Sequence, residues 1–275
     1  MMNMRNYVKA ADDTPLFFRD WGEGAAVVFA ASWALPSSMW QYQMAALTDA
    51  GLRCIAYDRR GHGRSGDPGG RYNFNTLSDD LARVIESLDL SDVTLVGHSM
   101  GACEITRYLS RHGADRIARL AFLAPAGPIL KKTADNPDGI DSAIFEAVRG
   151  LWRRDFPQWL AENARPFVMP DTPQASIDWF MAMMRENSLQ AVVELNRELT
   201  EADFRAEMRD IILPTLILHG TNDASAPLEL TGKRCAQLIR HSELKIYDGA
   251  PHGLFLTHAE QVNRDLLNFI SLPAA

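Results

Sequence analysis

The chain has 275 residues, of which 47% are hydrophobic and 23% charged, as in an ordinary globular protein with room for one large domain and an insertion. Its formal net charge of −7 provides no basic surface for nucleic acid or an anionic membrane, so we expect neither as a partner. Three widely spaced cysteines form no metal motif, and residues 1–13 lack the apolar segment of a signal peptide. These features predict reduced thiols in a cytoplasmic protein, and a periplasmic location stays open.

Short apolar runs separated by helical segments recur along the chain. Residues 7–20 predict a hairpin, because YVKA and PLFFRD flank the turn-like ADDT. Amphipathic stretches, such as residues 76–88, separate most of the later runs. Buried strands are expected at residues 25–31, 54–58, 93–97, 120–124, 215–220 and 244–249. This alternation predicts an α/β fold with a mostly parallel, eight-stranded sheet and helices on both faces.

The alternation stops once, between residues 128 and 208. This segment has helical periodicity and carries half of the six tryptophans, namely Trp152, Trp159 and Trp179. Prolines at positions 137, 157, 166, 170 and 173 divide it into short helices. We therefore expect a helical cap at 128–208, inserted into a core domain made of residues 1–127 and 209–275.

Two glycine-rich hexapeptides compete as functional motifs. The first, GHGRSG at residues 61–66, matches the G-x-G-x-x-G pattern of dinucleotide-binding loops, which requires a helix to begin at the third glycine. The residues after Gly66 are turn-forming, and the next helix is predicted only near Thr76. We therefore interpret this motif as a loop at the sheet edge and not as a nucleotide site.

The second hexapeptide, VGHSMG at residues 96–101, lies between a predicted strand and a predicted helix. This is the context of a nucleophile elbow, in which G-x-S-x-G places the serine in a tight turn at the start of a helix. Gly97 and Gly101 leave space where side chains would collide, and the helix N-terminus stabilises negative charge at Ser99. The alternative is an ordinary serine N-cap. We predict that Ser99 is a nucleophile.

A serine nucleophile needs a base, and the sheet order places the remaining groups in later loops. Asp223 follows the strand at 215–220, and His252 follows the strand at 244–249. The chain order serine, acid, histidine is the one that this architecture uses. His252 is the predicted general base and Asp223 the acid that orients it. Asp248, the alternative acid, is interpreted as a turn residue, and the histidines show no metal-ligand spacing.

Shorter motifs along nearly the whole chain point to one family; among them are RDWGEG, SSMWQYQMAAL, AYDRRGHGRS, LDLSDVTLVGHSMG, PTLILHGTND and LKIYDGAPHGL. The chain resembles the α/β-hydrolase superfamily, and within it the bacterial arylesterases that are also described as cofactor-free non-haem chloroperoxidases or perhydrolases. The resemblance implies Ser99, Asp223 and His252 as a catalytic triad. It implies the backbone N–H groups of Trp33 and Met100 as the oxyanion hole, and no metal, haem or flavin.

The chain departs from the family pattern at two places. Ala31-Ser32 stands where the family usually has His-Gly, and glycine there lets the backbone turn its next N–H toward the substrate oxygen. We expect serine to need a strained backbone or a shifted loop. Ala102 stands where many relatives have a second glycine after the elbow, which predicts different packing behind Ser99.

The leading hypothesis is a serine esterase of the carboxylesterase or arylesterase type. It would hydrolyse small, mainly apolar aryl or alkyl esters or lactones through an acyl-enzyme, with perhydrolysis open as a second activity. Two alternatives remain: a cofactor-independent lyase or oxygenase that uses His252 and Asp223 as a base pair, and a ligand-binding relative without catalysis. A homo-oligomer is also left open. The predicted pocket wall consists of Trp33, Trp152, Trp159, Phe167, Trp179 and Leu254, unless the cap residues only fill the cap's own core.

Overall fold

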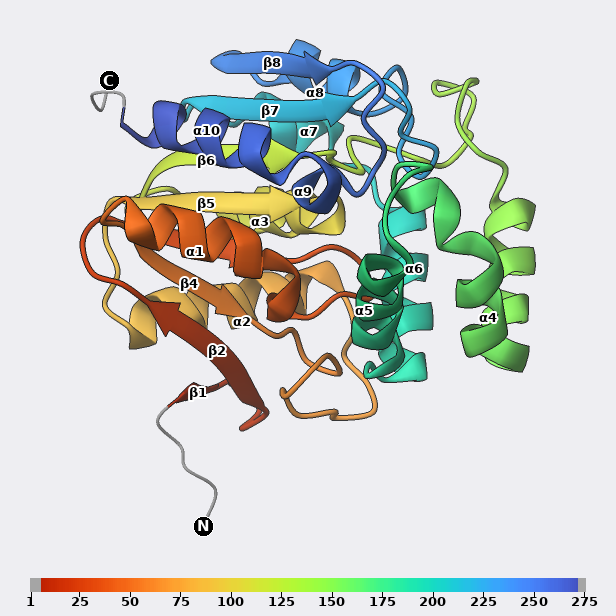
Figure 1. Ribbon diagram of the computed structural model, residues 1–275, viewed down its shortest axis with the longest axis horizontal. Coiled ribbons are helices and arrows are strands. Elements are labelled where there is room, and N and C mark those ends of the chain that lie inside the picture. The colour runs from red at the N-terminus through yellow and green to blue at the C-terminus, as the bar shows by residue number, and fades with distance from the viewer. Residues whose placement is uncertain (1–5, 272–275) are drawn as a thin grey trace.

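The computed structural model describes residues 6–271; residues 1–5 and 272–275 of the predicted core domain lie outside this description. One eight-stranded sheet has the order β1-β2-β4-β3-β5-β6-β7-β8 (Figure 1). Strands β3 to β8 are parallel, whereas β1 and β2 form the predicted antiparallel hairpin. The predicted α/β fold is confirmed. The strands are β1 (Tyr7–Lys9), β2 (Pro15–Trp21), β3 (Ala26–Ala30), β4 (Arg53–Tyr57), β5 (Val93–His98), β6 (Ile117–Leu123), β7 (Thr215–Gly220) and β8 (Ser242–Tyr247).

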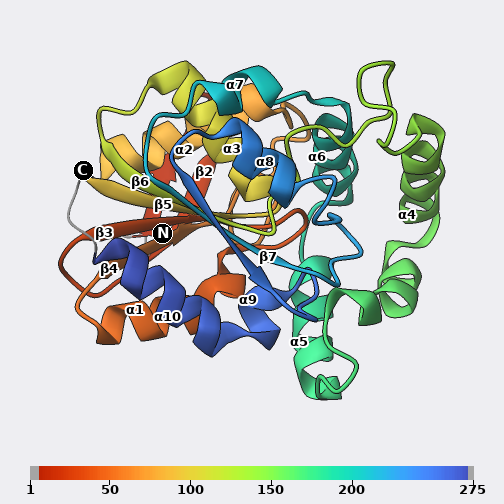
Figure 2. The same cartoon turned by 90° about the horizontal axis from the view of Figure 1, so that it is seen from above.

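Helices cover both faces of the sheet, as the view from above shows (Figure 2). Each layer of helices buries its own hydrophobic core against the sheet, and neighbouring strand residues such as Val28 and Phe29 face opposite cores. Because the strands are buried on both sides, the sequence encodes them as continuous apolar runs. One face carries α2 (Phe74–Ser87), α3 (Met100–His112), α7 (Arg205–Arg209) and α8 (Gly232–Leu238); the other carries α1 (Gln41–Asp49), α9 (Leu254–Thr257) and α10 (Ala259–Ile270).

Between β6 and β7 the chain forms helices that stand beyond the end of the sheet (Figures 1 and 2). They are α4 (Ser142–Asn163), α5 (Gln174–Arg185) and α6 (Leu189–Glu201), and α4 contacts both of the others. Prolines act as expected: α4 is kinked just before Pro157, and Pro173 precedes α5. The short helix α7, at the end of the predicted cap, packs against α3 and α8 of the core. The boundaries of the cap stay a prediction.

The arrangement of the parallel strands decides where functional groups can gather. Their carboxyl ends point toward α4, α5 and α6 (Figure 1), so the loops after β3, β5, β7 and β8 meet at one edge of the sheet. Ligands of open α/β sheets bind at this edge.

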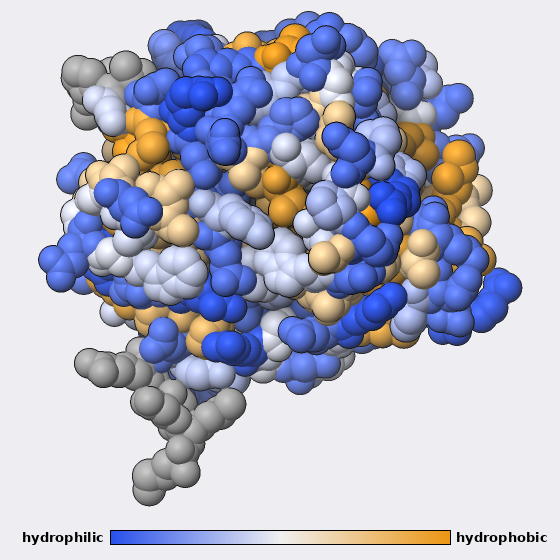
Figure 3. Space-filling view, in the orientation of Figure 1, coloured by the Kyte–Doolittle hydropathy of each residue, from blue (hydrophilic) through white to orange (hydrophobic). Residues whose placement is uncertain are grey.

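The surface adds little to this picture. The face seen in Figure 3 is mainly hydrophilic, with hydrophobic side chains in scattered patches. Among residues 6–271, no helix has both the length and the apolar character needed to cross a membrane.

Candidate active site

Ser99 occupies a strained turn between β5 and α3. Its backbone has φ 54° and ψ −113°, a conformation with positive φ that residues other than glycine rarely adopt. The two flanking glycines are sterically required: a Cβ on Gly97 would lie 2.6 Å from the Gly101 carbonyl carbon, and a Cβ on Gly101 would lie 2.3 Å from the Ala30 oxygen. The turn is held by tight packing on both sides, which is the geometry of the predicted elbow.

A buried carboxylate and an imidazole pair in the loops after β7 and β8. Asp223 Oδ2 lies 2.6 Å from His252 Nδ1, while Asp223 Oδ1 accepts the backbone N–H groups of Ser225 at 2.9 Å and Ala226 at 2.7 Å. Because the carboxylate can only accept, it fixes the His252 proton on Nδ1 and leaves Nε2 with a free lone pair. Asp248, by contrast, is exposed and accepts a hydrogen bond from Thr221.

A second imidazole, not foreseen from the sequence, contacts the same carboxylate. His219 Nε2 lies 3.1 Å from Asp223 Oδ2 and 2.8 Å from the Ala226 carbonyl oxygen. Burial opposes ionisation of Asp223, but His252 and His219 outweigh it and hold the pKa of this carboxyl below its usual value. The acid is therefore charged at neutral pH.

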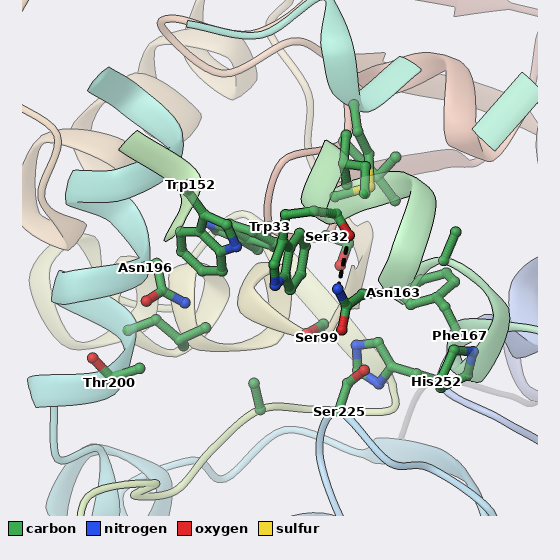
Figure 4. A pocket seen from close by; sticks show the side chains of 18 of the residues that line it. Ser32, Trp33, Ser99, Trp152, Asn163, Phe167, Asn196, Thr200, Ser225 and His252 are labelled. Atoms are coloured by element: carbon green, nitrogen blue, oxygen red, sulfur yellow. Dashed lines mark hydrogen bonds between the residues drawn. The ribbon is translucent and has the colours of Figure 1, made fainter. Parts of the chain in front are cut away.

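Ser99 and His252 line the same cavity, whose volume is about 230 Å³ (Figure 4). No hydrogen bond joins the Ser99 hydroxyl to the His252 ring among the described residues. Catalytic hydrogen bonds are often long without substrate and shorten in the substrate complex. The edge of the Phe167 ring packs on His252 with ring centroids 5.3 Å apart, which restricts the imidazole on its cavity side.

The loop after β3 carries the predicted oxyanion donor Trp33, and Arg59 holds this loop from behind. The buried guanidinium of Arg59 donates to the carbonyl oxygen of Ser32 at 2.8 Å and to that of Ala31, and it also pairs with Glu104. In a trans peptide the C=O and the following N–H point in opposite directions. The N–H of Trp33 therefore points away from Arg59, and it donates to no group in the described part of the chain.

Met100, the other predicted donor, is the first residue of α3. Its N–H has no acceptor within the helix, as is general for the first turn. The two N–H groups are thus unpaired, as an oxyanion hole requires.

The strain expected at Ser32 is absent. Its φ is not positive, and the left-handed residue of this loop is Ala34, with φ 54°. The N–H of Ser32 is instead directed at Met39 Sδ, 3.2 Å away. Serine therefore fits at this position without a glycine-like backbone. Ala102 is fully buried in α3 behind Ser99.

Four of the six residues predicted for the pocket wall line the cavity: Trp33, Trp152, Trp159 and Phe167. The other two predicted residues, Trp179 and Leu254, are not among those that line it. Trp179 packs on Tyr42 with ring centroids 5.8 Å apart, and Leu254 is completely buried in the core. Both follow an apolar pattern that does not distinguish a cavity wall from a core.

The sequence did not predict the polar residues that line the cavity. Ser32 and Ser225 lie near the reactive groups, while Asn163, Asn196 and Thr200 come from α4 and α6. Polar residues on amphipathic helices normally face solvent, so the sequence carries no signal for their position. The GHGRSG motif forms the predicted loop, and the next helix begins only at Phe74.

Comparisons with known proteins support this fold. The model of the alpha/beta hydrolase fold family matches residues 25–259. A non-heme chloroperoxidase of Kitasatospora aureofaciens is 38% identical over 94% of this chain and 97% of its own length. A bifunctional esterase/perhydrolase of Acinetobacter calcoaceticus is 33% identical over 96% of this chain and 99% of its own. The solved structure of an esterase from Exiguobacterium antarcticum superposes with a TM-score of 0.94 at 28% identity, covering 97% of this chain and 99% of that one.

Proposed function

Because the chain belongs to the α/β-hydrolase family, we propose that it hydrolyses small carboxylic esters or lactones through an acyl-enzyme on Ser99. The chain is a hydrolase with esterases among its relatives and structural neighbours. One observation supports the proposed reaction most directly: the strained Ser99 lines the same cavity as His252, which pairs with the buried Asp223.

In the proposed reaction, Ser99 Oγ attacks the carbonyl carbon of the ester while His252 Nε2 takes its proton. The oxygen becomes negatively charged and is stabilised by the N–H groups of Trp33 and Met100. The tetrahedral intermediate collapses, the bond to the alcohol breaks, and His252 returns the proton to the departing alcohol. A water molecule repeats these steps on the acyl-enzyme, which releases the carboxylic acid and restores Ser99.

The cavity supports a small substrate. An apolar cavity of about 150 Å³ holds one benzene molecule, so a cavity of about 230 Å³ fits an ester little larger than one ring with a short chain. Trp33, Trp152 and Trp159 form an aromatic cluster on its wall, with ring centroids of Trp33 and Trp152 4.6 Å apart. Such a wall favours aryl or alkyl groups.

Perhydrolysis is part of the proposal. If hydrogen peroxide replaces water at the acyl-enzyme, the products are a peracid and free Ser99. Measuring peracid formation with and without peroxide, on a panel of ester chain lengths, separates this activity from hydrolysis.

The decisive test is Ser99→Ala together with titration by an organophosphonate. We expect one phosphonyl group per chain, attached to Ser99, and loss of ester hydrolysis in the variant with an almost unchanged Tm. Stoichiometric labelling without hydrolysis of any ester would contradict the proposed substrate class. Activity of Ser99→Ala within tenfold of the wild type would contradict the acyl-enzyme and favour a lyase or oxygenase that uses His252 as a base. Absence of both activity and labelling would favour a ligand-binding protein.

A further inference from the structure

The cavity has a polar end away from the reactive groups. Figure 4 shows Asn196 and Thr200, both from α6, on the opposite side of the indoles of Trp33 and Trp152 from His252. An ester whose groups are all apolar offers no hydrogen-bond partner to the polar residues at this end of the cavity. The two polar side chains therefore need an explanation beyond the proposed function.

A buried arginine holds these side chains from behind. The guanidinium of Arg149, from α4, is completely buried, and its Nη1 donates to Asn196 Oδ1 at 2.8 Å and to Thr200 Oγ1 at 3.0 Å. Its Nη2 donates to Glu146 at 2.9 Å, and its Nε is buried without a partner among the described residues. Burial of such a cation is costly unless its donors are used. Arg149 fixes the polar end of the cavity.

The donors of Arg149 determine which way the Asn196 amide faces. A guanidinium has no acceptor, so the Asn196 atom that faces Arg149 must be the carbonyl oxygen. The amide nitrogen of Asn196 therefore faces away from Arg149 and donates to no group in the described part of the chain. Thr200 is already committed, because its hydroxyl accepts from Arg149 and donates to the Arg197 carbonyl oxygen at 3.2 Å. The N–H₂ group of Asn196 is therefore an oriented donor without an acceptor at this end, among the described residues.

We propose that Asn196 binds a second oxygen of the substrate, at the end remote from the ester that reacts. The substrate class is then a small bifunctional ester or lactone whose far end carries a ketone or carboxylate oxygen. Asn196 is the specificity-determining residue, and Arg149 is a positioning residue that acts through it. This inference rests on the proposed function for the identity of the reacting group, whereas recognition of the far oxygen involves binding alone.

The test measures binding in a Ser99→Ala background, so that it does not depend on turnover. Trp33 and Trp152 line the cavity, and their fluorescence reports its occupancy. The ligands are the ethyl ester of a short keto acid, the ester in which a methyl branch replaces the ketone oxygen, and the monoester of a dicarboxylic acid of similar length. We expect the keto ester to bind about tenfold more tightly than the branched ester, as one well-placed hydrogen bond allows. The dicarboxylic monoester shows whether a carboxylate is preferred to a ketone.

Two substitutions at Asn196 separate recognition from packing. Asn196→Leu removes the donor, and Asn196→Asp keeps an oxygen for Arg149 while replacing the free N–H₂ by an acceptor. Both should reduce the preference for the keto ester to about one, and Asn196→Asp should weaken binding of the dicarboxylic monoester most. Arg149→Met should also reduce the preference, because the Asn196 amide can then rotate. The matched control is Arg153→Met, which removes a cap arginine that pairs with Glu194 and does not line the cavity.

Equal affinity of the keto and branched esters in the Ser99→Ala background would overturn the inference, as would a preference that survives both Asn196 substitutions. Either result leaves the proposed esterase intact. Conversely, a preference that depends on Asn196 in a protein without esterase activity would uphold the subsite and contradict the proposed reaction. Melting curves of each variant establish that the comparison concerns folded protein.

Discussion

At the scale of single residues, one carboxylate serves two imidazoles. Asp223 contacts His252 at 2.6 Å and His219 at 3.1 Å. The two contacts have different consequences. His219 Nε2 also lies 2.8 Å from the Ala226 carbonyl oxygen, and its Nδ1 is buried without a partner in the described region. Of the two rings, only that of His252 lines the cavity, and Asp223 would stabilise the imidazolium that forms if His252 takes a proton there.

Asp223→Asn should lower kcat by roughly 10⁴-fold, because an amide presents its N–H₂ to the imidazole and reverses the tautomer. Asp248→Asn is the matched control, since Asp248 is exposed and lies only four residues from His252 in the sequence. Its kcat should stay within a few-fold of the wild type. Steady-state kinetics on one aryl ester checks both. A larger loss in Asp248→Asn would mean that the acid is assigned to the wrong residue.

Arg59→Lys tests the contact behind the oxyanion loop. Lysine keeps a charge beside Glu104 but cannot reach both loop carbonyl groups with a planar fork. We expect kcat to fall by about 10- to 100-fold with a small change in KM. The reason is that the Trp33 N–H would be misdirected, and its hydrogen bond to the substrate oxygen stabilises mainly the transition state. The variant should be compared only where its far-ultraviolet spectrum and melting curve show a folded chain. An unchanged kcat in a folded variant would show that Arg59 does not position the loop.

At the scale of elements, the helix α4 is two helices joined at Asp155. Asp155 has extended backbone angles (φ −159°, ψ 85°), and its Oδ1 accepts the N–H of Gln158 at 3.0 Å. This is the geometry of an N-cap, with Pro157 placed where a helix tolerates proline. The second half of α4 carries Trp159 and Asn163, which line the cavity. The N-cap residue Asp155 therefore supports the half of α4 that forms part of the cavity wall.

Asp155→Ala should cost about 1 kcal/mol of stability and lower Tm by roughly 2–4 °C, as is usual for a domain of this size. The KM for aryl esters should rise, since the fraying half-helix carries Trp159. Asp155→Ser retains a capping oxygen and should behave like the wild type in both measurements. Calorimetry and steady-state kinetics distinguish the two variants. Equal effects of alanine and serine would rule out capping as the cause.

The elements show what the sequence can and cannot predict. A strand such as β3 is recognisable because burial on both sides leaves only apolar residues, and the strand order then gathers Ser99, Asp223 and His252 at one edge. The partners of Arg59 and Arg149 are not predictable in this way. Each bonds groups that are remote in sequence, and arginine has the same local pattern on a solvated helix face. Trp179 shows a related limit, because an aromatic residue at helical spacing fits a core as well as a cavity wall.

At the scale of the whole molecule, acid stability depends on histidines that are buried without charge. Burial and the nearby Arg59 lower the pKa of His62 to about 4, although a hydrogen bond to the Arg60 carbonyl oxygen acts in the opposite direction. Burial, followed by the neighbouring His252, also lowers the pKa of His98. In the unfolded chain a histidine has a pKa near 6.5, so the unfolded state binds more protons below that value. Stability is therefore present above about pH 6.5 and is lost as the pH falls toward 4.

For His62 alone this loss amounts to about 3 kcal/mol, at roughly 1.4 kcal/mol for each pKa unit. The free energy of unfolding, measured by urea titration at pH 7, 6, 5 and 4, should fall most steeply between about pH 6.5 and 4. His62→Gln should flatten that slope. His241→Gln is the control, because His241 is exposed and its replacement removes no buried histidine. A free energy of unfolding that is constant from pH 7 to 4 would contradict this account.

The polar and reactive ends of the cavity come from different segments of the chain. Ser99, Asp223 and His252 belong to loops of the sheet, whereas Asn196, Thr200 and Arg149 belong to α4 and α6. The two groups have no hydrogen-bond partner in common in the described region, so a substitution at one end of the cavity removes no hydrogen bond from the other end. During divergence, α4 and α6 could therefore accumulate substitutions that change what is recognised while the bond-breaking apparatus stays constant.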